Sequence, residues 1–475
     1  MIRLLILISC LLLPYSPVIA QQGSLPEFGE GNAVSLGQEY YLGRAWLMSF
    51  RRQAPILNDP LIQDFVENIT YRLAETSQLR ERRLEIVLVE NKSINAFAVP
   101  GGIVGVHNGL ILQAETEAQF ASVLAHELAH LSQRHFSRGL ENRKRSTAAN
   151  LAGLLSGLVL IAAGSSDAGM AAVMGGQAAA MDSQLRYSRK HEQEADRIGM
   201  QNQVAAGLDP GGAAGMFTVM QRESRKYGAR PPEFLLTHPL TESRIADARN
   251  RARTYPKKIH EDNPEFQLMR SRVKLSFIED SGEAVAYFRQ QRAEGDKHAV
   301  AAQYGLILAL TKNGDYAEAR SMLRPMREFS PSNMVYGIAD ADLDIEEERY
   351  DTAIARLEKG LRLVPDNHPI TMYLAKAYFR AGYYGKADTL LSKHSRKHPS
   401  DAHLWYVLAE VQGKARNILG VHQSRAEYFA LNGALAKAIE QLNLALRLAS
   451  DNATQERIHT RIDYFRNIAA ALKQL

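Results

Sequence analysis

The chain has 475 residues, of which 45% are hydrophobic and 23% are charged, and its formal net charge is +5. This composition is typical of globular proteins, and the length favours two domains over a single hydrophobic core. The net charge is small for this length and no basic stripe is interleaved with aromatic residues. The composition therefore argues against a dedicated nucleic-acid-binding protein.

Residues 1–20 have the pattern of a secretory signal peptide. A basic residue precedes an apolar run over 4–13, and residues 18–20 offer a small-residue cleavage site. We expect export to a bacterial periplasm and a mature chain that begins near Gln21. A lipoprotein signal ending at Cys10 is the alternative, which is disfavoured because the apolar run continues past this residue.

Cys10 is the only cysteine, so a chain cleaved after residue 20 has no thiol. Such a protein uses neither disulfides nor thiolate ligands. Any metal ion must therefore be held by His, Asp or Glu side chains.

The segment before residue 82 is expected to be a linker followed by helices. Asp59-Pro60 is typical of a helix start, because aspartate caps a helix and proline suits its first turn. The apolar residues that follow have helical spacing: Ile62, Phe65, Val66, Ile69 and Leu73.

Strands are predicted next. A β-branched run over 84–89 predicts one strand, and residues 95–106 predict a strand, a turn at Pro100-Gly101-Gly102 and a second strand that continues to Leu112. In zinc peptidases such an edge can pair with an extended substrate. The spacing alone favours an ordinary hairpin over a strand that pairs with substrate.

The segment His126-Glu127-Leu128-Ala129-His130 matches the H-E-x-x-H signature of zinc hydrolases. Residues four apart share one face of a helix, so His126 and His130 can bind one Zn²⁺ together. Glu127 lies beside them, where its carboxylate can deprotonate a water molecule. The alternative is a polar helix face that matches this short pattern by chance.

The surrounding residues predict a helix with one free face. Thr116 and Gln119 fit an N-terminal capping box, and Gly139 fits a C-terminal stop. On the side opposite the histidines, an apolar stripe is expected to face the core: Phe120, Leu124, Leu128 and Leu131.

Residues 151–181 are rich in Ala, Gly, Leu and Met. The longest apolar part, over 151–163, is too short to span a bilayer. We expect a helical hairpin that folds over or beside the active site. A contact between Leu151–Met181 and the membrane surface is the alternative.

The segment 187–199 predicts a polar helix with three carboxylates. A zinc site with two histidines needs a third protein ligand, and a ligating histidine usually donates its second N–H to a carboxylate. Glu192 and Asp196 are stacked four apart, so Glu192 is the expected ligand and Asp196 the expected partner of a histidine. Glu194 is the second choice as ligand, and a solvated charged helix is the alternative to any site.

His238 precedes Pro239 in a predicted loop, and a helix is expected to begin near Thr241. Spacing alone gives this histidine no role. A domain boundary is expected soon afterwards, around 255–258.

The C-terminal half repeats with a period of 34 residues. Three ladders coincide at this spacing: Tyr316, Tyr350 and Tyr384; Ala319, Ala353 and Ala387; Pro331, Pro365 and Pro399. They predict tetratricopeptide repeats, which are stacked helix pairs that bind protein segments. A further unit at Gly433 departs from the 34-residue period, which predicts an insertion around 413–421. The histidines of this half are expected on the surface: His368, His394, His398 and His403.

Residues 91–250 resemble the gluzincin family that includes the HtpX heat-shock protease and the CAAX prenyl proteases. The resemblance rests on three segments in the right order, which are 95–102, 126–130 and 192–196. The chain lacks the several spanning helices of the integral-membrane members. It therefore looks like exported, soluble relatives with C-terminal tetratricopeptide repeats.

The resemblance implies a fold and a site. The fold class is α+β and mostly helical: a zinc metallopeptidase domain with a small β-sheet over 21–262, then an all-α repeat superhelix over 263–475. It implies one Zn²⁺ held by His126, His130 and Glu192, with Glu127 as catalytic base and Asp196 behind a ligand. It also implies that His238 is a removable fourth ligand that keeps the protease latent, with Arg244 contributing nearby.

The function implied is that of a periplasmic zinc endopeptidase with chaperone-like activity, which degrades misassembled outer-membrane proteins. The implied partners are the β-barrel assembly machinery and its outer-membrane β-barrel clients, such as the lipopolysaccharide-export barrel. The alternative is an assembly scaffold that acts mainly through its repeats and carries a latent protease. A membrane-surface protease is the third option.

Overall fold

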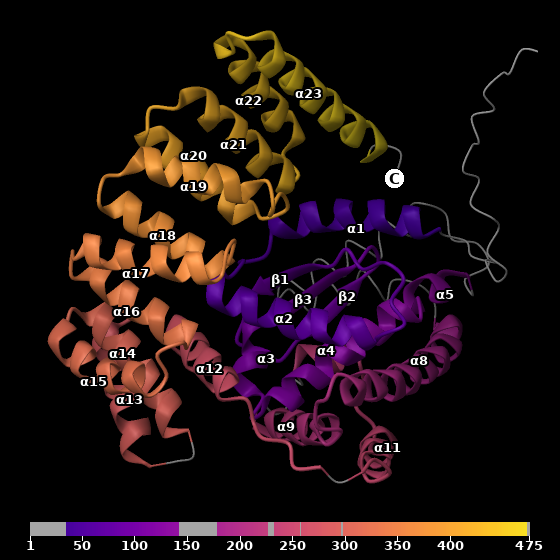
Figure 1. The fold of residues 1–475 in the computed structure, drawn as a ribbon. Helices are drawn as coiled ribbons and strands as arrows, with labels where there is room; N and C mark the ends of the chain where they lie inside the picture. Colours follow the sequence, from indigo (N-terminus) through magenta and orange to yellow (C-terminus); the bar gives the residue numbers. More distant parts are fainter. Residues whose placement is uncertain (1–34, 142–177, 227–231, 257, 296–297, 473–475) are drawn as a thin grey trace, which may run out of the picture.

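The computed structural model describes residues 35–141, 178–226, 232–256, 258–295 and 298–472. The signal peptide expected over 1–20 and most of the hairpin expected over 151–181 lie outside them. The described chain is mostly helical, with one small sheet (Figure 1). Among its described helices, none combines the length and the apolar content needed to cross a membrane.

The N-terminal half surrounds a three-stranded sheet of order β1-β3-β2, in which β3 pairs parallel with β1 and antiparallel with β2. The strand and hairpin predictions are confirmed, but the second strand ends at His107 and α3 follows it. The elements are α1 (Leu36–Arg51), α2 (Pro60–Thr76), β1 (Glu85–Val89), β2 (Ala96–Val99), β3 (Ile103–His107), α3 (Asn108–Gln113), α4 (Glu117–Ser132), α5 (His135–Glu141), α8 (Ala178–Ala205), α9 (Gly212–Lys226), α10 (Glu233–Thr237) and α11 (Glu242–Ala252).

Helix α4 is the central helix of this half and packs against α2, α8, α9 and β2. Of its predicted apolar stripe, Phe120, Leu124 and Leu128 are fully buried and Leu131 is partly buried. The prediction that the opposite face is free is wrong, because His126 and Glu127 are buried as well. Thr116 caps the helix by accepting from the Gln119 N–H, but the Gln119 side chain accepts from Glu115, so only half of the capping box forms.

The predicted stop at Gly139 is wrong. Helix α4 ends at Ser132, and Arg134 turns the chain with a left-handed φ of 51°. Gly139 lies in the next helix, α5. A non-glycine residue therefore makes the turn, which is why a search for glycine placed the end of α4 too late.

The C-terminal half is a curved array of antiparallel helices (Figure 1). The ladder tyrosines begin α15, α17 and α19, and the ladder alanines are fully buried, which confirms the repeats. The helices are α12 (Pro264–Ser276), α13 (Ser281–Ala293), α14 (Ala299–Asn313), α15 (Tyr316–Phe329), α16 (Met334–Glu346), α17 (Tyr350–Leu363), α18 (His368–Arg380), α19 (Tyr384–Ser395), α20 (Ala402–Lys414), α21 (Ile418–Leu431), α22 (Leu435–Leu448) and α23 (Asn452–Leu472).

The offset that predicted an insertion around 413–421 has a simpler origin. Ile418 and Val421 continue the 34-residue ladder, and Ile418 begins α21. Leu435 then begins α22, one helix later. The Gly433 unit is therefore shifted by one helix of the array, and α20 and α21 stay in register.

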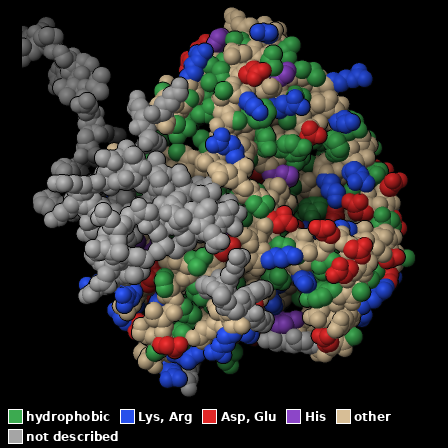
Figure 2. All heavy atoms as spheres, turned by 180° about the vertical axis from the view of Figure 1, so that it is seen from behind, with side chains coloured by type: hydrophobic (Ala, Val, Ile, Leu, Met, Phe, Trp, Pro, Cys, Tyr) green, Lys and Arg blue, Asp and Glu red, His purple; other side chains and the backbone are tan. Residues whose placement is uncertain are grey.

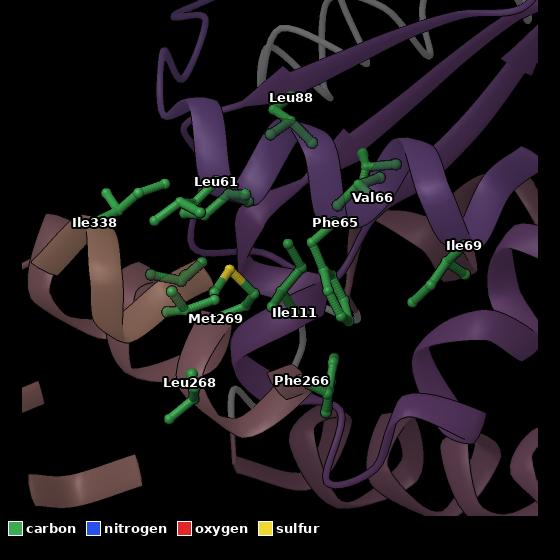
Figure 3. Close-up of a cluster of buried hydrophobic side chains, with 14 of the residues drawn as sticks. Leu61, Phe65, Val66, Ile69, Leu88, Ile111, Phe266, Leu268, Met269 and Ile338 are labelled. Atoms are coloured by element: carbon green, nitrogen blue, oxygen red, sulfur yellow. The ribbon is translucent and has the colours of Figure 1, made fainter. Parts of the chain in front are cut away.

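The two halves share one hydrophobic core. Phe266 of α12 packs against Phe65 of α2 and Phe120 of α4, with ring centroids 6.1 and 5.8 Å apart. Figure 3 shows this cluster continuing to Ile338 of α16. The array also returns to the N-terminal half, because α18 contacts α2 and α21 contacts α1. The repeats thus hold a fixed position on the domain that carries the H-E-x-x-H motif.

The face opposite that in Figure 1 carries interspersed acidic and basic side chains over the repeats (Figure 2). Several charged side chains of the repeats form ion pairs. Arg320 and Arg356 both bind the buried carboxylate of Asp344, with N–O distances of 2.8 and 3.1 Å. Such pairs between neighbouring helices fix the register of the stack.

Candidate metal centre

Helix α4 brings His126 and His130 side by side, as their spacing predicts. Their Nε2 atoms are 2.9 Å apart, so both rings direct this nitrogen to the same place beside the helix. His126 is 5% exposed, so its polar ring atoms must be satisfied inside the protein.

Helix α8 supplies Glu192 opposite this pair. Its carboxylate oxygens lie 3.4 Å from Nε2 of His126 and 3.4 Å from Nε2 of His130. The two helices approach closely because Gly199 of α8 faces the backbone of Ala125, where a Cβ would come within about 3.0 Å of the main chain. Glycine at this position therefore helps to set the distance between Glu192 and the histidines.

His238 closes the cluster from the loop after α10. Its Nδ1 lies 3.1 Å from both carboxylate oxygens of Glu192 and 3.4 Å from Nε2 of His126. The four side chains His126, His130, Glu192 and His238 each offer a ligand atom within 4.8 Å of the others. Nothing in the local sequence of a histidine before proline predicts this contact.

Glu127 lies beside the cluster and is 1% exposed. The backbone N–H of Ala98 in β2 hydrogen-bonds to its carboxylate, and burial raises its pKa. Among the described residues its Oε1 has no hydrogen-bond partner, and Nε2 of His238 lies 3.5 Å from it. This oxygen is therefore free to accept a proton from a water molecule.

Asp196 and Arg244 support the cluster from behind. Asp196 Oδ1 lies 3.0 Å from Nδ1 of His126, which fixes the ring with Nε2 toward the cluster. Arg244 binds Asp196 with two hydrogen bonds of 2.7 and 2.8 Å, donates to the carbonyl of Pro239 at 2.8 Å, and lies 3.1 Å from Glu192. The guanidinium thus connects the carboxylates of α8 to the loop that carries His238.

His135, which the spacing of the sequence did not indicate, lies behind His130 as Asp196 lies behind His126. Nδ1 of His135 lies 3.0 Å from Nδ1 of His130, and its Nε2 lies 3.1 Å from Glu194. Glu194 also binds Arg138, so this carboxylate lies behind the cluster and outside the set of four ligand atoms. No local sequence pattern indicates this contact, because it depends on the left-handed turn at Arg134 that places His135 against His130.

Burial and the facing charges shift the pKa values of the cluster in opposite directions. Burial opposes charge on His126, yet Asp196 and Glu192 raise its pKa to about 10. Burial lowers the pKa of His130 to about 3. Burial also works against an ionised Glu192, but the facing histidines hold the pKa of this carboxyl well below its usual range. An anionic carboxylate and convergent imidazoles are a donor set that fits a divalent cation.

Comparison with known proteins decides the family. Residues 60–252 match peptidase family M48, and residues 278–332 and 344–411 match tetratricopeptide repeats. The β-barrel assembly-enhancing protease of Escherichia coli (strain K12) is 34% identical over 95% of this chain and 93% of its own. The chain belongs to the family of β-barrel assembly-enhancing proteases. It is therefore a metallopeptidase, with a peptidase domain joined to repeats.

Two further relatives are also named as proteases. A putative β-barrel assembly-enhancing protease of Vibrio cholerae is 32% identical over 96% of this chain and 95% of its own. The mitochondrial metalloendopeptidase OMA1 of Arabidopsis thaliana is 29% identical, over 42% of this chain and 37% of its own. A metallopeptidase of this family needs a metal ion, and the residues around Glu127 fit one.

Proposed function

We propose that the protein is a periplasmic zinc endopeptidase that degrades misassembled outer-membrane β-barrel proteins. The cluster of His126, His130, Glu192 and His238 carries this proposal, together with Glu127, whose Oε1 accepts no hydrogen bond from a described residue. Its two-histidine, one-carboxylate core is a donor set typical of catalytic zinc. The signal-peptide pattern over 1–20 supports export, and the name of the relatives supports the β-barrel clients.

Bound Zn²⁺ would polarise the scissile carbonyl and lower the pKa of the attacking water. Glu127 takes the proton of that water through its free Oε1 and later gives it to the leaving amine. The raised pKa of Glu127 suits this exchange, because a carboxylate in a buried site holds a proton more readily. Asp196 and His135 keep the two histidine rings oriented throughout.

His238 acts in this proposal as a removable fourth ligand. The short helix α10 before it is anchored by a hydrogen bond from the Phe234 N–H to the carbonyl of Ile94, 3.2 Å long. The loop after it is held by Arg244 through Pro239. Release of this segment would move one imidazole away and leave an open position, which a catalytic zinc needs.

Strand β2 is the proposed docking edge for substrate. It is an edge strand of the described sheet and its Ala98 contacts Glu127 directly. An extended peptide added to this edge would bring a scissile bond to the base. The segment that carries His238 already binds the carbonyl of Ile94, two residues before β2 begins, so substrate and this segment would compete for neighbouring places.

The repeats are proposed to bind the β-barrel assembly machinery or its clients, because such arrays present concave surfaces to protein segments. A scaffold role without proteolysis is the alternative. Removing the repeats after residue 262 is a poor test, since it would uncover Phe65 and Phe120. A catalytic variant of the full chain separates the two functions without this damage.

The test is Glu127→Gln in the full-length protein, with Glu75→Gln on the exposed face of α2 as the matched control. Loss of a general base lowers the rate by roughly 10²–10⁴-fold. We expect normal zinc content, no cleavage of an unfolded outer-membrane protein, and an unaffected control. Retained cleavage would refute the role of Glu127. Full support of barrel assembly in cells by the variant would favour the scaffold for that role.

A further inference from the structure

Three histidines of the repeat array lie close together in space. In the sequence they are far from the H-E-x-x-H helix. His368 begins α18, His394 lies in the last turn of α19, and His398 follows in the loop before α20. Nδ1 of His368 and Nε2 of His394 are 3.0 Å apart. The three ring centroids are 4.2 to 5.2 Å from one another. The expectation that these histidines lie on the surface is wrong, because His394 is 4% exposed and the other two are half-buried.

The arrangement has the features of a ligand set. Each of the three rings offers a nitrogen within 4.8 Å of the others, so one cation can reach all three. Nε2 of His368 lies 3.8 Å from the Asp401 carboxylate, which leaves its Nδ1 toward the other histidines. At 3.8 Å this contact is longer than a hydrogen bond, so it is looser than the 3.0 Å contact of Asp196 with His126.

Burial also favours the neutral form of these rings. Burial lowers the pKa of His394 to about 3, and it lowers the pKa values of His368 and His398 as well. Neutral imidazoles keep a lone pair for a cation, whereas three charged rings at these distances would repel one another.

We propose that His368, His394 and His398 form a second metal site, which takes a divalent late transition-metal ion such as Zn²⁺. Imidazole nitrogens select zinc, nickel and copper over magnesium and calcium, which prefer oxygen. Three protein ligands leave the fourth position of a tetrahedral ion to water or to a group from a partner.

The site lies where the array meets the peptidase domain. The loop between α19 and α20 holds both His398 and Ser400, whose carbonyl accepts a hydrogen bond of 3.1 Å from Arg51 at the end of α1. Helix α18, which starts at His368, packs on α2. A metal ion here would tie α18, α19 and this loop together beside that contact, and so would stabilise the docking of the repeats.

The test counts metal ions in the full-length protein. The chain is mixed with one and then two equivalents of zinc chloride, desalted and examined by native mass spectrometry. We expect two zinc ions in the wild type and one in His398→Gln, which changes a half-buried loop residue and spares the buried His394. His422→Gln, whose ring binds Gln441 elsewhere in the array, is the matched control and should keep two.

A second measurement removes the influence of the peptidase site. In a chain with His126→Ala and His130→Ala, one equivalent of Co²⁺ should still give the visible absorption of tetrahedral cobalt, and His398→Gln should abolish it. Circular dichroism confirms that each variant is folded. The proposal is overturned if the folded double variant takes up no cobalt, or if His398→Gln leaves uptake unchanged.

Discussion

Replacing Asp196 with asparagine tests whether the carboxylate behind His126 contributes to metal affinity. The carboxylate holds Nδ1 of His126 at 3.0 Å and binds Arg244 through both oxygens. An asparagine has the same shape but only one acceptor oxygen. Either His126 or Arg244 must therefore face an amide NH₂ group, and one buried N–H donor loses its partner.

The expected loss of zinc affinity follows from these contacts. Loss of a carboxylate behind a ligating histidine typically lowers metal affinity 10–100-fold, or about 1.4–2.8 kcal/mol. We expect the upper half of this range, because Arg244 is 4% exposed and also positions Glu192 and the carbonyl of Pro239.

The assay is competition for zinc between the protein and a chromophoric chelator at neutral pH. Asp247→Asn is the matched control: Asp247 also accepts from an arginine, Arg251, at 2.9 Å, but its side chain is 34% exposed. The control should retain wild-type affinity, because exposed ion pairs contribute little. Equal affinities for Asp196→Asn and the wild type would show that this carboxylate does not contribute to zinc binding.

Three further predictions follow. His238→Ala should raise cleavage of an unfolded substrate or self-cleavage, measured on gels over time; loss of activity with zinc retained would make this residue a transition-state donor instead. His135→Gln should weaken zinc binding about tenfold, because Nδ1 of His130 loses its oriented partner, and unchanged affinity would contradict that role. Phe266→Ala should lower the free energy of unfolding by about 3–5 kcal/mol in a denaturant titration, since the ring fills the core between the halves. A cost below about 1 kcal/mol would show that this core is not shared.

Regular spacing made much of the fold predictable. Helix α4 and its buried face follow from the apolar residues at helical intervals, and the repeats follow from three ladders with one period. The same regularity predicted that Glu192 and Asp196 share a face of α8. These features are local, so the spacing of residues along the chain determines their geometry.

The contacts that spacing could not predict join segments far apart. His238 reaches the cluster from a loop, and only the family resemblance suggested it. Arg244 connects two helices and that loop, and the histidines of α18 and α19 meet across a repeat. Such contacts depend on how helices pack against one another. The end of α4 was missed for a local reason, since arginine rarely adopts the left-handed turn found at Arg134.

The most direct test of the account is a crystal structure of the full-length protein with anomalous diffraction recorded on both sides of the zinc absorption edge. We expect a zinc peak bound by His126, His130 and Glu192, with His238 as fourth ligand in the latent state. A zinc-loaded crystal with no anomalous peak among these side chains would contradict it.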